Sequence, residues 1–361
     1  AFRQAWQRVL QRHSILRTRF AWEELAEPVQ VVHRQVELPW EELDWRDSSP
    51  PQERQQLASL LQEDRRRGFD LGKAPLMRLQ LIRTGRSTWR FVWSHHHLLL
   101  DGWSLPIVLQ EVLLAYEGLV RDQPVTLPRP TPYRNYIAWL SRQDRQAAAS
   151  FWQQRLAGFS APTPLPLERA ARQPEDHAEL PGEHEHELPA ELNRALEQFA
   201  RQHRLTLNTL VQGAWAILLS RFSGEEEVLF GATVSGRSAA LEGIESMVGL
   251  FINTLPVRVQ VPRDAAVRSW LEELQAQQVE LRQYEYTPLV DAQRCSEIRA
   301  GTPLFETLVV FENYPLDRSL QETPGQTGLD LREIRVHERT NYPLVLTVIP
   351  GPTMSLRVQY D

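Results

Sequence analysis

Three consecutive histidines, His95, His96 and His97, stand ahead of Asp101 and Gly102. An imidazole titrates near neutral pH, so it can accept a proton from a nucleophile or hold that proton in a hydrogen bond. The aspartate could orient a histidine ring, or it could pair with a distant arginine and fix the turn. Gly102 permits a positive φ angle or the close approach of another segment. These residues predict a proton-transfer or positioning site.

Other chemistry is conceivable for the histidines and for the single cysteine. A run of histidines can bind a metal ion, and a histidine among leucines is commonly a satisfied core residue. His184 and His186 lack a third ligand nearby in sequence and fit an exposed edge strand. Cys295 excludes an internal disulfide and has no neighbouring histidine to activate it. We therefore expect no metal site and no catalytic thiol.

The elements on either side of the histidines would hold them in place. Residues 91–94 are apolar and aromatic, which predicts a buried strand. Ser104 is a suitable helix N-cap. Apolar residues then recur at helical spacing: Leu105, Val108, Leu109, Val112, Leu113 and Tyr116. The histidines and Asp101 thus lie in a turn between a strand and an amphipathic helix.

Composition indicates a soluble globular protein. The chain has 361 residues, of which 42% are hydrophobic and 24% charged, and this length suits two domains of ordinary size. A net charge of −6 gives no reason to expect nucleic acid or an anionic membrane as a partner. We see no signal peptide or spanning segment and expect a cytoplasmic protein. The chain begins in the middle of a helical pattern, so we expect a fragment of a longer polypeptide.

Helical and strand patterns alternate along the chain and predict an α/β (α+β layered) fold. Helical patterns include residues 2–13 and 50–67, and one continuous helix is expected from Tyr133 to Leu156. A second apolar helix, around 210–218, is expected to be well buried. Proline and charged residues mark 161–181 as a linker. We therefore expect an N-terminal lobe over 1–160 and a C-terminal lobe over 182–361.

The string His96-His97-x-x-x-Asp101-Gly102-Trp103-Ser104 resembles the active-site motif of condensation domains of nonribosomal peptide synthetases. These belong to the chloramphenicol acetyltransferase-like superfamily. Further family motifs match in order, the longest being residues 247–258. Others are Arg12-His13 with Leu16-Arg17-Thr18, Tyr133-x-x-Tyr136-x-x-Trp139, and weaker matches at 286–289 and 302–308. The resemblance covers nearly the whole chain, with both ends clipped. For the Tyr133–Trp139 motif we favour a packing role.

The resemblance implies two acetyltransferase-like lobes in a V-shaped pseudo-dimer with a tunnel between them. His97 would be the catalytic base or a positioner of the attacking amine, and the amide of Gly102 would lie near the reacting carbonyl. His96 would pack inward. Asp101 would pair with Arg258 across the lobes. Structural supports would be Arg12 and Arg17, and candidates to line the substrate channel are Trp103, Ser104 and Asn253.

The same resemblance implies peptide-bond formation during antibiotic or siderophore biosynthesis. A donor and an acceptor peptidyl carrier protein would present thioesters on phosphopantetheine arms, and the domain itself would bind no cofactor. An adenylation domain would adjoin it in the same polypeptide, and we favour an L-configured donor. One alternative is an epimerization domain, although Val234-Ser235-Gly236-Arg237 stands where such domains carry Glu-Gly-His-Gly-Arg. The other is a non-catalytic platform that docks a tailoring enzyme.

Overall fold

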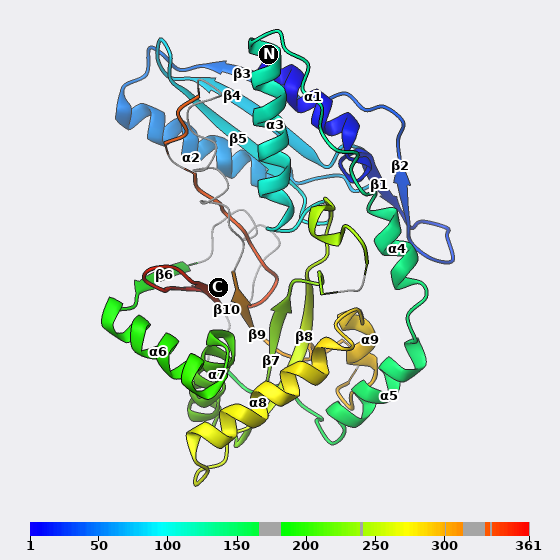
Figure 1. Cartoon of the computed structure of the whole chain (residues 1–361), viewed down its shortest axis with the longest axis vertical. Helices are drawn as coiled ribbons and strands as arrows, with labels where there is room; N and C mark the ends of the chain where they lie inside the picture. The colour runs from blue at the N-terminus through cyan, green and yellow to red at the C-terminus, as the bar shows by residue number, and fades with distance from the viewer. Residues whose placement is uncertain (166–181, 239–240, 300, 313–328, 333, 361) are drawn as a thin grey trace.

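The computed structural model describes residues 1–361 except 166–181, 239–240, 300, 313–328, 333 and 361. It has the expected mixed α/β content and two halves, each built on its own main sheet (Figure 1). The upper half contains both the first helix and the histidines. The lower half contains the larger sheet and most of the later helices.

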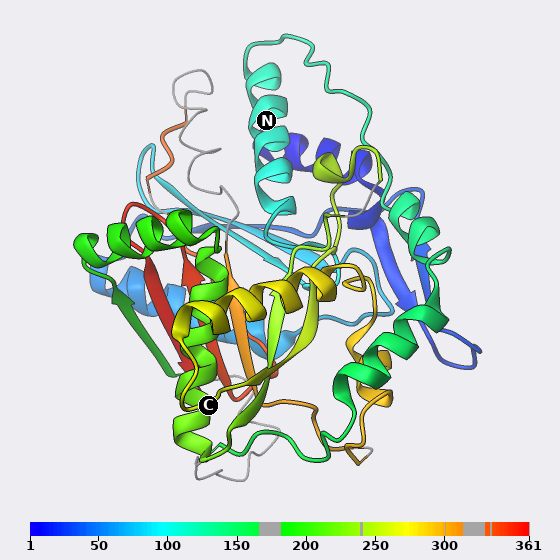
Figure 2. The same ribbon diagram turned by 60° about the horizontal axis from the view of Figure 1, so that its bottom comes forward.

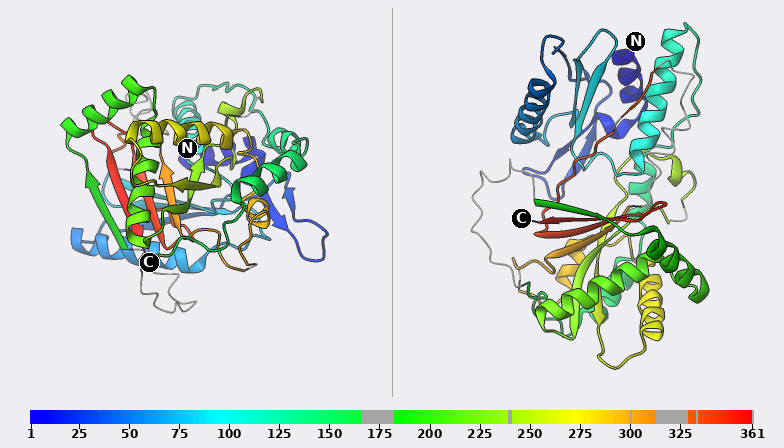
Figure 3. Two further views of the ribbon diagram at one scale, coloured as in Figure 1. Left: turned by 90° about the horizontal axis from the view of Figure 1, so that it is seen from below. Right: turned by 90° about the vertical axis from the view of Figure 1, so that its left-hand side faces the viewer.

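The upper half is built on a three-stranded sheet with the order β3-β4-β5. Strand β3 (Trp40–Asp44) is parallel to β4 (Met77–Arg83), and β4 is antiparallel to β5 (Trp89–His95). Helices α1 (Phe2–Arg12) and α3 (Ser104–Val120) pack on one face, where Phe91 and Trp93 meet Trp6. Helix α2 (Pro50–Arg67) lies on the opposite side of the sheet (Figure 3). Its bounds agree with the prediction.

A separate hairpin projects from the upper half (Figure 2). It is made of β1 (Thr18–Ala21) and β2 (Val29–Val32), which pair antiparallel. A 3₁₀ turn, η1 (Ser14–Arg17), connects α1 to it. Phe20 packs against the core of the upper half and fixes the base of the hairpin.

The lower half contains a six-stranded mixed sheet with the order β6-β11-β10-β9-β7-β8. The three helices on one face pack over it, while its other face is turned toward the upper half (Figure 3). The strands are β6 (Gly182–Glu187), β7 (Glu227–Val234), β8 (Asn253–Gln260), β9 (Thr307–Phe311), β10 (Leu344–Ile349) and β11 (Ser355–Tyr360). The helices are α6 (Ala190–His203), α7 (Leu207–Ser223) and α8 (Val267–Arg282). β6 is an edge strand, so the interpretation of His184 and His186 is confirmed.

The region between the halves differs from the prediction. Two helices, α4 (Arg134–Leu140) and α5 (Arg145–Leu156), replace the single helix expected there. Asp144 is the N-cap of α5, because its carboxylate accepts the amide protons of Gln146 and Ala147. Trp152, Leu156 and Phe159 then pack into the core of the lower half. The two cores therefore do not divide at residue 160, and most of the expected linker lies outside the described residues.

Helix α7 is not buried on all sides. Trp215, Ala216 and Leu219 face the core, whereas Leu218 is 48% exposed and Phe222 is 66% exposed. The prediction of a well-buried helix was wrong, because this helix lies in an outer layer and covers the sheet with one face only. Two short elements complete the described chain, η3 (Ile244–Ser246) and α9 (Leu289–Arg294).

Candidate active site

The three histidines have different surroundings because strand residues alternate between faces. His95 ends β5 and is partly buried, with its Nδ1 atom enclosed, and its ring centroid lies 4.9 Å from that of Trp93. His96 points the other way, with its ring 6.3 Å from Phe69. His97 follows in the turn and is exposed. Only the third imidazole is thus presented openly to solvent.

Burial keeps the two inner histidines neutral at neutral pH. Desolvation is the main cause that lowers the pKa of His95 to about 4, with smaller electrostatic contributions from the neighbouring His97 and His96. Desolvation also lowers the pKa of His96, with a smaller contribution from His97. The Nδ1 atom of His96 accepts the amide proton of Leu98 at 3.1 Å. The ring proton of neutral His96 therefore resides on Nε2, and its inward packing role remains a prediction.

Backbone bonds fix both ends of the segment 96–104, here called the histidine turn. At its start, the His96 amide donates to the Leu76 carbonyl at 2.9 Å. At its end, the Asp101 amide donates to the Gly249 carbonyl at 3.2 Å, which joins the turn to the lower half. His97 lies between these two attachments. Its backbone is therefore held by both halves of the molecule.

Asp101 is almost completely buried and its carboxylate is saturated with donors. Oδ1 accepts the amide and the hydroxyl of Ser104 at 2.9 and 2.7 Å. Oδ2 accepts the amide of Phe251 at 3.2 Å. The residue preceding α3 is Trp103, so Ser104 is the first helical residue and not the N-cap that we expected. Asp101 performs the capping instead, through the Ser104 amide.

The ion-pair partner of Asp101 is Arg237, so the prediction of Arg258 was wrong. Nη2 of Arg237 lies 3.0 Å from Oδ1 and 3.3 Å from Oδ2, and the two side chains are 7% and 1% exposed. Arg258 instead forms two 2.8 Å bonds to Glu227 and donates to the Ala157 carbonyl. Arg258 is five residues beyond Asn253 in β8, and a strand rises about 3.3 Å per residue, so it lies roughly 16 Å further along. The register of β8 directs it toward the end of α5.

Arg237 has several further partners that hold it at the junction between the halves. Nη1 donates to the carbonyls of Ile244 and Met247 at 2.7 and 3.1 Å, and Nη2 donates to the Ser104 hydroxyl at 3.0 Å. Its guanidinium carbon lies 4.1 Å from the centroid of the Phe251 ring. A buried guanidinium with this many acceptors acts as a rigid connection.

Two of the channel candidates are engaged in other interactions. The Ser104 side chain is fully buried, and its hydroxyl also contacts the Gly249 carbonyl at 2.8 Å, so its prediction as a channel residue was wrong. The amide nitrogen of Asn253 donates to the carbonyls of Glu285 and Thr287 at 2.8 and 2.7 Å. Trp103 is partly exposed, and its channel role remains a prediction.

The two arginines predicted as supports make structural contacts within the upper half. Arg12 donates from Nε to Glu111 at 2.9 Å, and the same carboxylate bonds to His13 at 2.6 Å. Arg17 donates to the carbonyls of His33 and Arg34. Within the described part of the chain, neither guanidinium bonds to the histidine turn. They stabilise the end of α1 and the start of the hairpin.

Aromatic packing closes the junction. The Tyr133 hydroxyl donates to the Leu250 carbonyl, and its ring meets Phe251 edge-on at 5.2 Å. Tyr136 packs on Phe251 at 4.6 Å, and burial raises its pKa to about 12. A Cβ on Gly249 would lie 2.1 Å from the Tyr133 ring, so glycine is required for this close approach. The packing role predicted for the Tyr133–Trp139 motif is confirmed.

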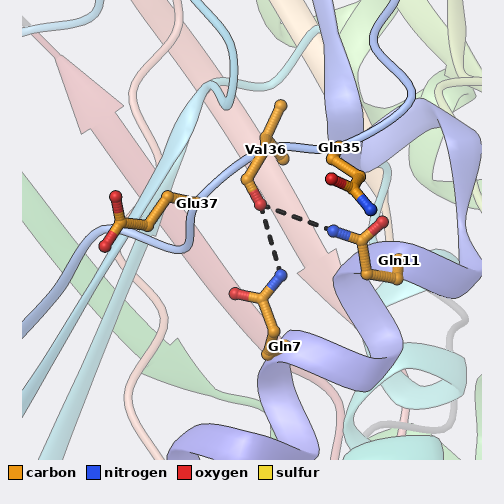
Figure 4. Close-up of a pocket in the computed structure, with 5 residues that line it drawn as sticks. All are labelled: Gln7, Gln11, Gln35, Val36 and Glu37. Carbon is orange, nitrogen blue, oxygen red and sulfur yellow. Dashed lines mark hydrogen bonds between the residues drawn. The ribbon is translucent and has the colours of Figure 1, made fainter.

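A surface pocket lies elsewhere, between α1 and the segment 35–37 (Figure 4). Gln7 and Gln11 donate to the Val36 carbonyl at 3.2 and 3.4 Å, and Gln7 accepts the Leu38 amide proton. These glutamines fasten the segment to α1. Over the residues that the structure describes, no group of three histidine, cysteine or acidic side chains could hold a metal ion, and no helix has the length and apolarity to cross a membrane.

Comparison with known proteins identifies the family. A model of the condensation domain matches residues 1–361. One of the linear gramicidin synthase proteins from Brevibacillus parabrevis is 49% identical over 364 residues, which cover 100% of this chain and 5% of that protein. The chain thus spans a small fraction of the relatives that it matches.

Two solved structures share the fold. A four-domain nonribosomal peptide synthetase bound to AMP and glycine has a TM-score of 0.79 at 18% identity, over 99% of this chain and 28% of that one. The X-domain from teicoplanin biosynthesis also has a TM-score of 0.79, at 20% identity over 99% of this chain and 81% of that one. The chain belongs to the condensation domain family of nonribosomal peptide synthetases.

Proposed function

We propose that this chain forms an amide bond between two carrier-bound substrates. The α-amine of an acceptor aminoacyl thioester attacks the carbonyl of a donor aminoacyl or peptidyl thioester. The donor thiol leaves, and the lengthened peptide remains on the acceptor carrier. The observation that carries the proposal is the exposed His97 in a turn held by both halves.

The energetics suit a site with few catalytic groups. A thioester is already reactive, so holding two tethered substrates in contact supplies much of the rate. His97 holds or deprotonates the attacking amine, a role typically worth ~10²–10⁴-fold. Because the pKa of His95 and of His96 is lowered, neither adds a competing positive charge beside His97 at neutral pH.

The amide of Gly102 would stabilise the developing oxyanion. Among the described residues, no acceptor is hydrogen-bonded to this amide, and Gly102 lies in the same turn as His97. Removing one oxyanion-hole donor typically costs about 3–4 kcal/mol of transition-state stabilisation in acyl-transfer enzymes. Trp103, next in the chain and partly exposed, would contact the substrate beside it.

The substrates imply the partners. An upstream donor and a downstream acceptor peptidyl carrier protein would deliver phosphopantetheine arms from the two ends of a tunnel between the halves. An adenylation domain of the same polypeptide would charge the acceptor carrier. The family membership and the small share of each relative that the chain spans support a place within a larger synthetase.

The decisive test replaces His97 by alanine and supplies donor and acceptor carriers loaded with aminoacyl groups. We expect amide formation to fall ~10²-fold or more. His184→Ala, an exposed histidine on edge strand β6, is the matched control and should leave the rate unchanged. An unaltered rate in His97→Ala would remove His97 from the chemistry.

Two other outcomes would identify the alternative functions. Deuterium uptake at the donor α-carbon in heavy water, without amide formation, would identify an epimerization domain. Binding of a tailoring enzyme, without turnover of either kind, would identify a docking platform.

A further inference from the structure

Glu285 is a buried carboxylate that the proposed chemistry does not use. It lies just after α8, is 8% exposed, and its Oε1 accepts a hydrogen bond from the Ser238 hydroxyl. No basic side chain is paired with it in the described part of the molecule. A buried carboxylate without a salt-bridge partner is costly, so its presence needs a reason.

Ser238 connects Glu285 to the junction. It directly follows Arg237, the residue that bonds to Asp101. The segment enters the junction after β7, with Gly236 at φ +63° and so close to Phe251 that a Cβ would lie 1.9 Å from its carbonyl oxygen. The Glu285–Ser238 bond therefore holds the chain at the residue after Arg237, as the close approach of Gly236 holds it at the residue before.

Asn253 fixes Glu285 in turn. Its side-chain nitrogen donates to the carbonyls of Glu285 and Thr287, and its backbone pairs with Val234, the last residue of β7. The turn 285–287 is thus attached to the strand ends from which the Arg237 segment emerges. These contacts form one connected set that reaches the residue next to Arg237 through Ser238.

Glu285 and Asp101 both lie close enough to Tyr136 to affect its pKa. Both carboxylates raise the pKa of Tyr136, after the larger effect of burial, while Arg237 lowers it. Glu285 therefore lies near the only described ion pair that connects the two halves at the histidine turn.

We propose that Glu285 is a positioning residue for the histidine turn. It acts through Ser238 on Arg237, through Arg237 on Asp101, and thereby on the backbone that carries His97. The role in turnover rests on the proposed function, whereas the effect on the turn does not.

The experiment compares three variants of the complete chain. Glu285→Leu removes the acceptor, Glu285→Gln keeps an acceptor of equal size, and Glu273→Leu alters an exposed glutamate on α8 as the control. Glu285→Leu removes the hydrogen bond from Ser238, and we expect it to lower kcat about tenfold. KM for each carrier should change less than about twofold. Glu285→Gln should recover kcat to within about threefold of the parent, and Glu273→Leu should match the parent.

Amide hydrogen exchange gives a readout that needs no turnover. In Glu285→Leu, amides of residues 98–104 should exchange about tenfold faster, while those of β4 stay unchanged. In an Asp101→Asn background the Glu285→Leu change should add less than about twofold, because the connection is already broken. Unchanged exchange at 98–104 in a folded Glu285→Leu protein, or full additivity with Asp101→Asn, would overturn the inference. If the parent forms no amide, the proposed function fails, and exchange alone decides the role of Glu285.

Discussion

Replacing Arg237 by methionine should destabilise the protein far more than the same change at Arg258. Arg237 is 7% exposed and donates to Asp101, Ser104 and two backbone carbonyls. Methionine fills much of the same space and leaves the Asp101 carboxylate buried without its counter-charge. Breaking a buried pair in this way typically costs about 3–5 kcal/mol. We expect a loss of that size in the free energy of unfolding.

Arg258→Met is the matched control. Its pair with Glu227 is more open, with side chains 20% and 34% exposed, and pairs in such positions contribute about 0–1 kcal/mol. The carbonyl bond to Ala157 adds about 1 kcal/mol more. Arg237→Met should therefore cost at least ~1 kcal/mol more than Arg258→Met, although both replace one arginine by methionine.

Urea unfolding followed by tryptophan fluorescence measures both variants under one condition. Converting Asp101 to leucine in the Arg237→Met background should recover part of the loss, since the unpaired charge is then gone. Equal destabilisation by Arg237→Met and Arg258→Met would refute the assignment of Asp101 to Arg237. So would a loss below ~1 kcal/mol for Arg237→Met.

Three further predictions concern the junction and the histidines. Gly249→Ala should cost about 1–3 kcal/mol in thermal unfolding, because the new methyl group meets the Tyr133 ring, and pairing it with Tyr133→Leu should recover part of this loss. Acidification from pH 7 to pH 5 should remove about 2 kcal/mol of stability through His95. Its pKa is lowered from 6.5 to about 4, so the unfolded chain gains a proton that the folded chain does not, and a His95→Asn variant should show a flatter pH profile. Ser104→Ala should lower stability by about 1–2 kcal/mol in urea, since Gly249 and Arg237 lose a shared acceptor.

Local patterns predicted the elements around the site well. The strand over 91–94, the turn after it and a helix beginning near Ser104 were expected, because alternation and helical periodicity are properties of neighbouring residues. The strand was expected to be buried, but all of its residues are partly or fully exposed. The bounds of α2 agreed for the same reason, with Ser49 and Pro50 marking its start. The break between α4 and α5 was missed, although Asp144 ahead of Arg145 is a helix N-cap signal that the sequence contained.

The partner of Asp101 could not be derived from local patterns. Arg237 is 136 residues away, and its approach depends on the register of β7 against β8 and on the positive φ of Gly236. The resemblance favoured Arg258 because it lies in the longest matching motif. A usable signal was nevertheless present, since Ser235-Gly236-Arg237 directly follows the apolar run that forms β7, where a side chain is held at the end of a strand.

His97 belongs to the upper half, but the backbone that carries it is held by contacts from both halves. His96 fixes the start of the turn with its own ring, which is a contact inside the upper half. The end of the turn depends on the Gly249 carbonyl, the Phe251 amide and Arg237, all from the lower half. A change in how the halves pack therefore moves the backbone next to His97 directly, without passing through the core of either half.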